Sequence, residues 1–399
     1  MRVMRSISEE ITREWKKEYR CFVRHAKWFP DKETVQAASS VVIHFVPLRC
    51  VLPEKSHLGS SKDISGRWEY FEQRKVRAVT FPGVINEGRP LARKFIRYSA
   101  ARFLREHGLI EKEVTAIIDA PGSFPKLALI LKRLCPKIRI VYRAHNAEFP
   151  HRWERLRVTG GSREKKRLWK IVLQQILSDA RMLRRSDVVL SISDADRELY
   201  WKRLSRWVRG SSQILTLPYF LSAPYVPCLE KSERQKLAVC ISSGQSKESI
   251  IDESVVIFKE AVLRYRRAFP DSNWKFCITG GVADVDASTG IEVTGFVNSP
   301  LDVLVKSRVA CVFTNHGWGF KTKILDAILA ETMVLVSQTV YRRLPIEVRP
   351  YCLAVDPLQP QALHEALEIA EVKQAELETP TVNETFRDRS FAVLDGYFS

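Results

Sequence analysis

The chain has 399 residues, which is too long for one ordinary domain and fits two domains of about 200 residues each. Hydrophobic residues make up 45% and charged residues 28%, a composition that excludes a disordered, collagen-like or fibrous chain. No apolar stretch approaches the ~18–20 residues that a membrane-spanning helix needs, and no apolar segment follows the first basic residues. Neither a membrane span nor a signal peptide is therefore expected.

The net charge of +18 is concentrated in the first half of the chain. Up to residue 223 there are 45 basic and 23 acidic residues, whereas the remainder has 19 basic and 23 acidic residues. The basic residues are densest at 89–105 and 152–185. The positive electrostatic field of these residues attracts nucleic acid, anionic lipid headgroups or phosphorylated substrates. Helix faces that are simply exposed to solvent explain a run of charged residues equally well.

Short apolar runs alternate with segments of helical periodicity from about residue 20 onward. In the first half, this pattern predicts strands at 20–25, 41–47, 76–82, 114–120, 138–144, 188–193 and 214–220. Helices are predicted between them, for example at 91–106, 124–133, 165–184 and 194–203. Strands that are nearly all apolar and separated by helices indicate a parallel sheet covered on both faces.

The pattern is interrupted at 223–235, a charged, proline-containing stretch that is typical of a linker. After it, strands are predicted at 236–242, 274–279, 291–296, 309–314 and 333–337. The sequence therefore predicts an α/β protein with two tandem Rossmann-like, doubly wound domains, at 1–222 and 236–380. A C-terminal helix at 381–399 is expected to pack back toward the N-terminal domain.

The most informative segment lies between the predicted strands at 309–314 and 333–337. Gly317 and Gly319 let the backbone approach a ligand closely, and the amides at a helix N-terminus favour an anion such as a diphosphate. Lys321 and Lys323 lie in the first turn, where the helix dipole disfavours lysine unless an anion is bound. Asp326, farther along the helix, can accept hydrogen bonds from a ribose. A tight strand-to-helix turn explains the glycine loop alone equally well.

This segment resembles the pattern G-x-G-x-x-x-K-x-x-[ED]-A of GT-B-fold glycosyltransferases, particularly those of family 4. The matching residues are Gly317, Gly319, Lys323, Asp326 and Ala327. Four other segments resemble motifs of the same family in the same order: YRAHNAEFPHR (142–152), RRSDVVLSISDADRE (184–198), TLPYF (216–220) and VTGFVNSPLDVLVKSRVACVF (293–313). The resemblance covers about residues 110–370 and implies the two-domain GT-B fold, with the domains facing each other across a cleft.

The resemblance implies that a nucleoside-diphosphate sugar binds the C-terminal domain and an acceptor binds the N-terminal domain. The donor-binding residues that it implies are Gly244, Lys247, Phe296, Gly317, Gly319, Lys321, Lys323 and Asp326. It also implies that His145 is the catalytic residue or orients the acceptor, although a histidine bonded to its own loop is the alternative. The acceptor-side residues that it implies are Asp119, Arg143, Asn146 and Glu148.

Two departures from the family pattern leave the donor sugar open. Many relatives have two acids spaced E-x7-E, and Trp318 occupies the position of the first. The loop after the first C-terminal strand offers Gly244 and Lys247 but lacks the arginine that relatives often have. Lys321 is the candidate for the missing charge.

We expect a cytoplasmic glycosyltransferase of the hexosyltransferase type, acting in polysaccharide biosynthesis without metal or cofactor. Its expected partners are a nucleotide-sugar, a glycan or lipid-linked anionic acceptor and an anionic membrane surface, on whose inner face it would lie peripherally. The alternatives are a nucleic-acid-binding protein, which only the charge supports because no nucleic-acid module is present, and a catalytically inactive GT-B scaffold.

The start of the chain raises a further expectation. In the family, the first domain opens with a central strand, whereas residues 6–17 here have helical character. Either the true start lies upstream, or the predicted strand at 20–25 takes the central place. In the second case this strand would pair directly with 114–119.

Overall fold

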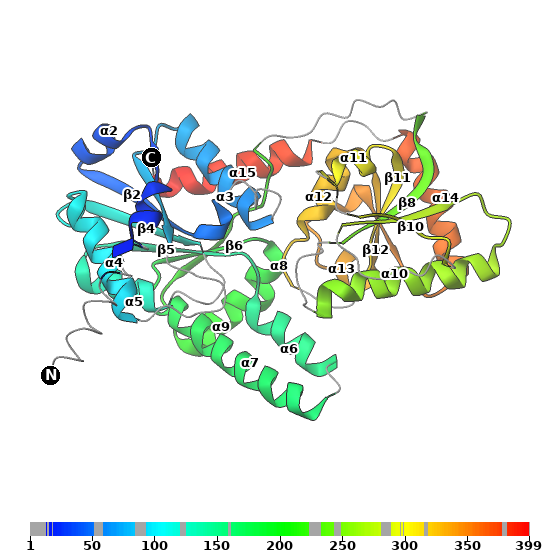
Figure 1. Cartoon of the computed structure of the whole chain (residues 1–399), viewed down its shortest axis with the longest axis horizontal. Coiled ribbons are helices and arrows are strands. Elements are labelled where there is room, and N and C mark those ends of the chain that lie inside the picture. Colours follow the sequence, from blue (N-terminus) through cyan, green and yellow to red (C-terminus); the bar gives the residue numbers. More distant parts are fainter. Residues whose placement is uncertain are drawn as a thin grey trace. The chain divides into compact units, whose positions relative to one another are not determined.

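The computed structural model describes residues 13, 16–17, 19–51, 59–83, 93–119, 125–158, 161–222, 233–242, 249–280, 289–295, 297, 299–314, 318–376 and 381–398. Internal contacts divide the chain into two units (Figure 1). The first unit comprises Met1–Phe149, Trp169–Ser222 and Asp388–Ser399, and the second comprises Pro150–Leu168 and Ala223–Arg387. Each unit contains one sheet with helices, which confirms the predicted class of two tandem doubly wound α/β domains.

The sheet of the first unit has seven strands in the order β1-β3-β2-β4-β5-β6-β7. They are β1 (Lys27–Phe29), β2 (Ser40–Pro47), β3 (Ala78–Gly83), β4 (Glu113–Asp119), β5 (Arg139–Ala144), β6 (Val188–Ser191) and β7 (Gln213–Thr216). Neighbouring strands are parallel except for β1, which pairs antiparallel with β3. The central strands are buried almost throughout, as expected for parallel strands covered on both faces.

Six of the seven strands predicted in this unit are present, and the prediction at 20–25 is wrong. The chain is helical through Arg24, with Tyr19 and Phe22 buried and Cys21 exposed. Buried side chains three residues apart share one helix face, whereas a strand would need a spacing of two. A short segment with mixed apolar and charged residues satisfied both patterns, and packing selected the helix.

The place beside β4 is occupied by β2, so the expectation that residues 20–25 take the central place is wrong. β2 pairs in parallel with β4, for example Val41 with Val114, and with β3 on its other edge. Residues 20–25 do not pair with 114–119, and the described sheet has no gap at this position. The chain passes from β2 outward to β3 and returns to β4, so the strand order reverses between β2 and β4.

Helices cover the sheet of the first unit (Figure 1). They are α2 (Lys32–Ala37), α3 (Gly59–Gln73), α4 (Arg93–Glu106), α5 (Pro125–Leu134), α8 (Asp194–Asp196), α9 (Lys202–Val208) and most of α7 (Ser162–Leu183). The end of α15 (Val382–Phe398) also belongs to this unit. Ser390 of α15 donates a hydrogen bond to the carbonyl of Pro218 at 2.8 Å, and Asp395 pairs with Arg74 at 3.0 Å.

The sheet of the second unit has six parallel strands in the order β10-β9-β8-β11-β12-β13. They are β8 (Gln235–Ile241), β9 (Lys275–Thr279), β10 (Glu292–Gly295), β11 (Ser307–Val312), β12 (Met333–Ser337) and β13 (Cys352–Val355). The five strands predicted in this half are present, and β13 is additional. Most of the predicted linker, 223–232, lies outside the described residues.

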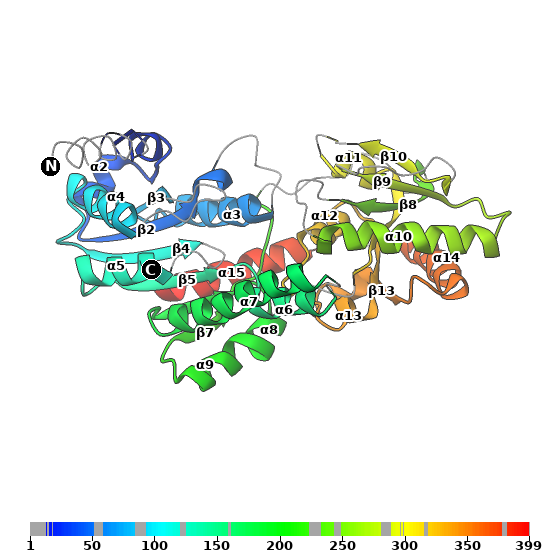
Figure 2. The ribbon, with the colours of Figure 1, turned by 60° about the horizontal axis from the view of Figure 1, so that its bottom comes forward.

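Helices cover both faces of the second sheet. α10 (Ser249–Ala268) and α14 (Pro360–Glu376) pack on one face, where Phe258, Tyr265 and Leu367 meet strand residues such as Leu335. α11 (Leu301–Leu304) packs on the other face, as Figure 2 shows. The other helices are α6 (Glu148–Val158), α12 (Thr322–Leu329) and α13 (Gln338–Tyr341). Among the described residues, no helix has both the length and the hydropathy to span a bilayer.

Candidate functional site

A cluster of charged side chains lies at the carboxyl edge of the first sheet, beside the reversal of strand order. Asp119 is the last residue of β4, and His145 directly follows β5. Asp119 pairs with Arg143 in the β4–β5 ladder, and Arg143 and His145 are two residues apart, so all three side chains point to one face. Open α/β sheets bind ligands at this edge.

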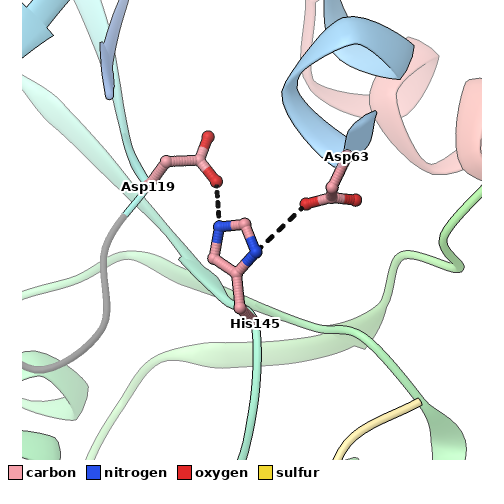
Figure 3. Close-up of side chains that lie close together, drawn as sticks. All are labelled: Asp63, Asp119 and His145. Carbon is pink, nitrogen blue, oxygen red and sulfur yellow. Dashed lines mark hydrogen bonds and ion pairs between the residues drawn. The ribbon is translucent and has the colours of Figure 1, made fainter. Parts of the chain in front are cut away.

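His145 lies between two carboxylates (Figure 3). Its Nε2 atom is 2.7 Å from Oδ1 of Asp119, and its Nδ1 atom is 3.6 Å from Oδ2 of Asp63. Asp63 comes from α3, which is remote in sequence from both strands. The structure thus unites the predicted residues Asp119 and His145 and adds Asp63, which sequence analysis missed.

Two buried arginines compensate the two buried carboxylates. Arg67, one turn after Asp63 on α3, donates to Asp63 at 2.8 Å and to Asp119 at 2.6 Å. Arg143 binds both oxygens of Asp63, at 2.8 and 3.0 Å. The four groups sum to zero charge, and buried ions are tolerated only when they are paired in this way.

These pairs control the ionisation of the carboxyl groups. Burial would raise the pKa of Asp63, but Arg143, Arg67 and His145 outweigh it and hold that pKa well below its usual range. Burial likewise opposes ionisation of Asp119, and Arg67 and His44 overcome it, so the pKa of Asp119 is also well below its usual range. Both carboxylates are therefore ionised at neutral pH.

A second histidine lies behind Asp119. His44 of β2 is fully buried, and its Nε2 atom hydrogen-bonds Oδ2 of Asp119. Its Nδ1 atom lies 3.4 Å from the hydroxyl of Thr80, which accepts a hydrogen bond from Trp68 at 2.8 Å. Burial lowers the pKa of His44 despite the neighbouring Asp119, so the ring is neutral. The guanidinium Nε atom of Arg67 also lies 3.3 Å from the Nε2 atom of His44, so this ring is enclosed by Asp119, Arg67 and Thr80.

The ionised Asp119 also orients the ring of His145. Because Asp119 is ionised, the Nε2 atom of His145 carries a proton and donates it to Asp119. The Nδ1 atom faces Asp63, so an imidazolium at this position would be stabilised by both carboxylates. A histidine backed by a buried carboxylate is the arrangement of a general base.

Asp63, Asp119 and His145 could also be read as metal ligands, because their ligand atoms lie within 4.8 Å of one another. Both oxygens of Asp63 already bind Arg143, and Asp119 already binds Arg67. A divalent cation would therefore compete with two buried guanidinium groups. The donor set fits a charge-compensated histidine better than a metal ion.

The other predicted acceptor-side residues lie beside this cluster with different exposure. Arg143 is fully buried and also donates to the carbonyls of Ser191 and Leu217, at 3.2 and 2.7 Å. These contacts join β5 to neighbouring segments and favour a structural role for Arg143. Asn146 and Glu148 are partly exposed, and the amide of Asn146 donates to Glu148 at 3.3 Å.

In the second unit, two of the predicted donor-binding residues lie in the described part of the β11–α12 connection, and two lie in α12 itself. Gly319 has φ = +83°, a left-handed conformation that favours glycine. Lys321 directly precedes α12, and its ammonium donates to the carbonyl of Trp318 at 3.2 Å. Lys323, in the first turn, donates to the carbonyl of Ile241 at the end of β8 at 2.7 Å. Burial lowers the pKa of Lys323.

Asp326 lies one turn farther along α12 and is buried, with 4% of its surface exposed. Gly319, Lys321, Lys323 and Asp326 thus belong to one loop and helix at the carboxyl end of β11. The remaining predicted donor-binding residues, Gly244, Lys247, Phe296 and Gly317, lie outside the described residues.

Trp318, which occupies the position of the family's first acid, is itself next to a carboxylate. Its indole nitrogen donates to Oε1 of Glu154 at 3.0 Å, and Arg343 donates to the same oxygen at 3.0 Å. The guanidinium of Arg343 lies over the Trp318 ring, 4.6 Å from its centroid. Glu154 belongs to α6 and is more than 160 residues from Trp318 in sequence, so no local pattern could have indicated this contact.

His151, also on α6, lies close to the same loop. Burial, with a further contribution from Lys321, lowers the pKa of His151 to about 4. Its Nδ1 atom is buried and has no hydrogen-bond partner among the described residues. The described part of the loop before α12, residues 318–321, is therefore accompanied by a carboxylate and a neutral imidazole from α6.

Comparison with known proteins finds similarity in structure only. No family model and no curated protein matches the sequence. The structure of Anabaena HepE in complex with UDP is similar with a TM-score of 0.54 and 10% identity, covering 90% of this chain and 100% of that chain. Sucrose-phosphate synthase from Thermosynechococcus elongatus is similar with a TM-score of 0.55 and 12% identity, covering 90% and 98%. The N-terminal domain of trehalose-6-phosphate phosphatase from Candida albicans is similar with a TM-score of 0.56 and 12% identity, covering 90% and 96%.

Proposed function

Because the chain has the GT-B fold, we propose that it is a glycosyltransferase that moves a sugar from a nucleoside diphosphate to a glycan or glycolipid acceptor. The observation that carries this proposal is the β11–α12 connection. Gly319 and Lys321 of this connection lie together with Lys323 and Asp326 of α12 at the carboxyl edge of the second sheet, where such sheets bind ligands. Structures of similar HepE contain UDP or UDP-glucose, which supports a uridine nucleotide as the first donor to test.

In this proposal the second unit binds the donor. The amides at the start of α12 and Lys321 bind the diphosphate, because a helix N-terminus and a cation both stabilise negative charge there. Asp326 accepts hydrogen bonds from the ribose. Gly317, Gly244, Lys247 and Phe296, which lie outside the described residues, complete the proposed donor site.

The same groups stabilise the leaving group. Negative charge develops on the diphosphate as the bond to the sugar breaks, and preorganised amides and cations stabilise that charge without a metal ion. Lys323 is bonded to the carbonyl of Ile241 and fixes the start of α12 against β8. We therefore assign the direct phosphate contact to Lys321 and a positioning role to Lys323.

In the first unit, His145 is proposed to accept the proton of the acceptor hydroxyl. Asp119 holds the imidazole by its Nε2 atom at 2.7 Å, which leaves Nδ1 as the basic atom. Asp63, 3.6 Å from Nδ1, would stabilise the imidazolium that forms. Asn146 and Glu148, which are partly exposed beside His145, are the proposed contacts for the acceptor.

A catalytically inactive scaffold is the second candidate, because Trp318 replaces an acid of the family pattern. The contact between Trp318 and Glu154 supports the enzyme instead, because it supplies a carboxylate next to the donor loop at 3.0 Å. We propose that Glu154 takes over the donor-sugar contact that the missing acid would make. The nucleic-acid-binding alternative is supported only by the charge of the first half, because the sequence contains no recognised nucleic-acid-binding module.

The test combines nucleotide binding with sugar transfer. Calorimetry with UDP, GDP and ADP is expected to find one preferred nucleotide, and Asp326→Ala is expected to weaken its binding about tenfold or more, as for a lost hydrogen bond to a charged group. Asp302→Ala, which removes an exposed acid of α11 in the same unit, is the matched control. An unchanged dissociation constant in Asp326→Ala would contradict the ribose assignment. Nucleotide binding without sugar release from any UDP-, GDP- or ADP-sugar would favour the inactive scaffold.

A further inference from the structure

Helix α7 (Ser162–Leu183) has an exposed apolar stripe in addition to its buried face. Trp169, Leu173 and Leu177 are 49%, 51% and 44% exposed. They are spaced four residues apart, so they lie one above the other along the helix. The helix already buries another face, on which Leu168 and Val172 lie. Internal packing therefore does not account for the exposed stripe.

Cations accompany this stripe. The exposed basic residues of α7 are Arg163, Lys165, Lys166, Arg167, Lys170 and Arg181. Glu164 is the only exposed acid among residues 163–183 of the helix. Lys166 precedes Trp169 by three residues, and Lys170 precedes Leu173 by three, so both ammonium groups lie beside the apolar side chains. Neither lysine forms an ion pair with a described carboxylate.

We propose that α7 docks in the interfacial region of an anionic lipid bilayer. In this arrangement Trp169, Leu173 and Leu177 insert between the headgroups, while Lys166 and Lys170 contact the lipid phosphates. Tryptophan favours the membrane interface, and a helix with an apolar stripe flanked by lysine and arginine is the type that lies in this plane. Each cation adds electrostatic attraction to an anionic leaflet.

Charge complementarity selects the bilayer over a second copy of the chain. Two α7 helices facing each other would bring their lysines and arginines together, with Glu164 as the only exposed acid among residues 163–183 to offset them. An anionic surface instead neutralises these cations. The docking surface goes beyond the proposed transfer reaction and can be tested without any donor or acceptor sugar.

The experiment measures binding of the full chain to vesicles by flotation. Phosphatidylcholine vesicles are compared with vesicles in which about a third of the lipid is phosphatidylglycerol. The chain is expected to bind only the anionic vesicles, and binding should decrease with salt because charges are screened within about 8–10 Å. A cation near an anionic surface strengthens binding about fivefold, so reversing both charges in Lys166→Glu/Lys170→Glu should weaken it at least about 25-fold.

The apolar stripe is tested separately with a matched control. Leu173→Asp places a carboxylate in the stripe and is expected to weaken vesicle binding at least about tenfold. Val372→Asp makes the same kind of change on α14, where Val372 is 60% exposed, and is expected to leave binding unchanged. Both variants should keep the unfolding temperature of the wild type, because both side chains are exposed.

Three results would overturn the proposal. Equal binding to neutral and anionic vesicles would remove the role of the cations. An equal loss of vesicle binding in Leu173→Asp and Val372→Asp would show that α7 is not the docking element. A dimer in sedimentation that Leu173→Asp dissociates, with vesicle binding unaffected, would assign the stripe to contact between copies of the chain.

Discussion

The buried charge cluster of the first unit leads to a quantitative prediction for Asp119→Asn. Asp119 is fully buried and receives hydrogen bonds from Arg67 at 2.6 Å and from His145 at 2.7 Å. Asparagine has nearly the same shape but no charge. The substitution therefore leaves two buried guanidinium groups, those of Arg67 and Arg143, with Asp63 as their single carboxylate partner.

Asp119→Asn is expected to lower the free energy of unfolding substantially. Removing one partner of a buried ion pair typically lowers the free energy of unfolding by about 3–5 kcal/mol. That is a large part of the roughly 5–15 kcal/mol by which a domain is usually stable. The control is Asp395→Asn, which breaks the exposed pair with Arg74 at 3.0 Å, whose side chains are 33% and 49% exposed. An exposed pair contributes about 0–1 kcal/mol, so Asp395→Asn should lower the free energy of unfolding much less than Asp119→Asn does.

The pH dependence of this loss has a definite sign. The pKa of Asp119 is held below its unfolded value of about 3.9, because Arg67 and His44 outweigh the effect of burial. A carboxyl group with a lowered folded pKa stabilises the protein above its unfolded pKa, and this contribution is lost as the pH falls through the folded pKa. The wild type should therefore lose stability below about pH 4, and Asp119→Asn should show a shallower loss.

The assay is urea-induced unfolding followed by circular dichroism at several pH values. The wild type and Asp395→Asn should have similar midpoints, whereas Asp119→Asn should unfold at a clearly lower urea concentration at pH 7. If the two variants lose the same free energy of unfolding, or if Asp119→Asn keeps the acid dependence of the wild type, the buried charges do not stabilise the unit as argued.

The other predictions concern activity and a second buried acid. His145→Asn should lower turnover about a hundredfold or more with little change in nucleotide affinity, as measured by steady-state kinetics and calorimetry. Glu154→Gln should lower kcat/KM about ten- to a hundredfold, as for a lost charged hydrogen bond to the donor sugar, and an unchanged value would remove Glu154 from the site. Burial raises the pKa of Asp179 to about 7, so its stabilisation is complete below the unfolded pKa and is lost as the pH rises through 7. Asp179→Asn should remove the part of this loss that falls between pH 5 and pH 8 in urea unfolding, which is on the order of 3 kcal/mol.

Much of the fold could be predicted from the sequence because most of its strands are continuous apolar runs. β2, β4 and β5 are buried on both faces, and a strand in that position needs apolar residues at nearly every place. Where the apolar pattern was short and interrupted by charge, as at 20–25, local sequence allowed both a strand and a helix. Only packing, which buried Tyr19 and Phe22 together, selected the helix.

Residues of the candidate site could be predicted where they lie at the end of a strand or the start of a helix, because the local sequence shows where those ends are. Asp119 ends β4 and His145 directly follows the adjacent β5, so the rule that ligands bind at the carboxyl edge identified them. Lys321 and Asp326 followed from the order of strand, glycine loop and helix. His44 carried a weak signal, as a single histidine within an apolar strand, and no inference was drawn from it.

The partners of these residues depended on the tertiary structure. Asp63 and Arg67 stand four residues apart on α3, which is a common surface pair, and only the packing of α3 against the sheet makes them the counterions of Asp119 and Arg143. Glu154 meets Trp318 because α6 packs against a loop more than 160 residues away. Apolar periodicity and strand ends are local properties that a sequence displays directly. The ionisation and contacts of a charged side chain depend on which distant groups share its burial, and the folded chain alone determines that.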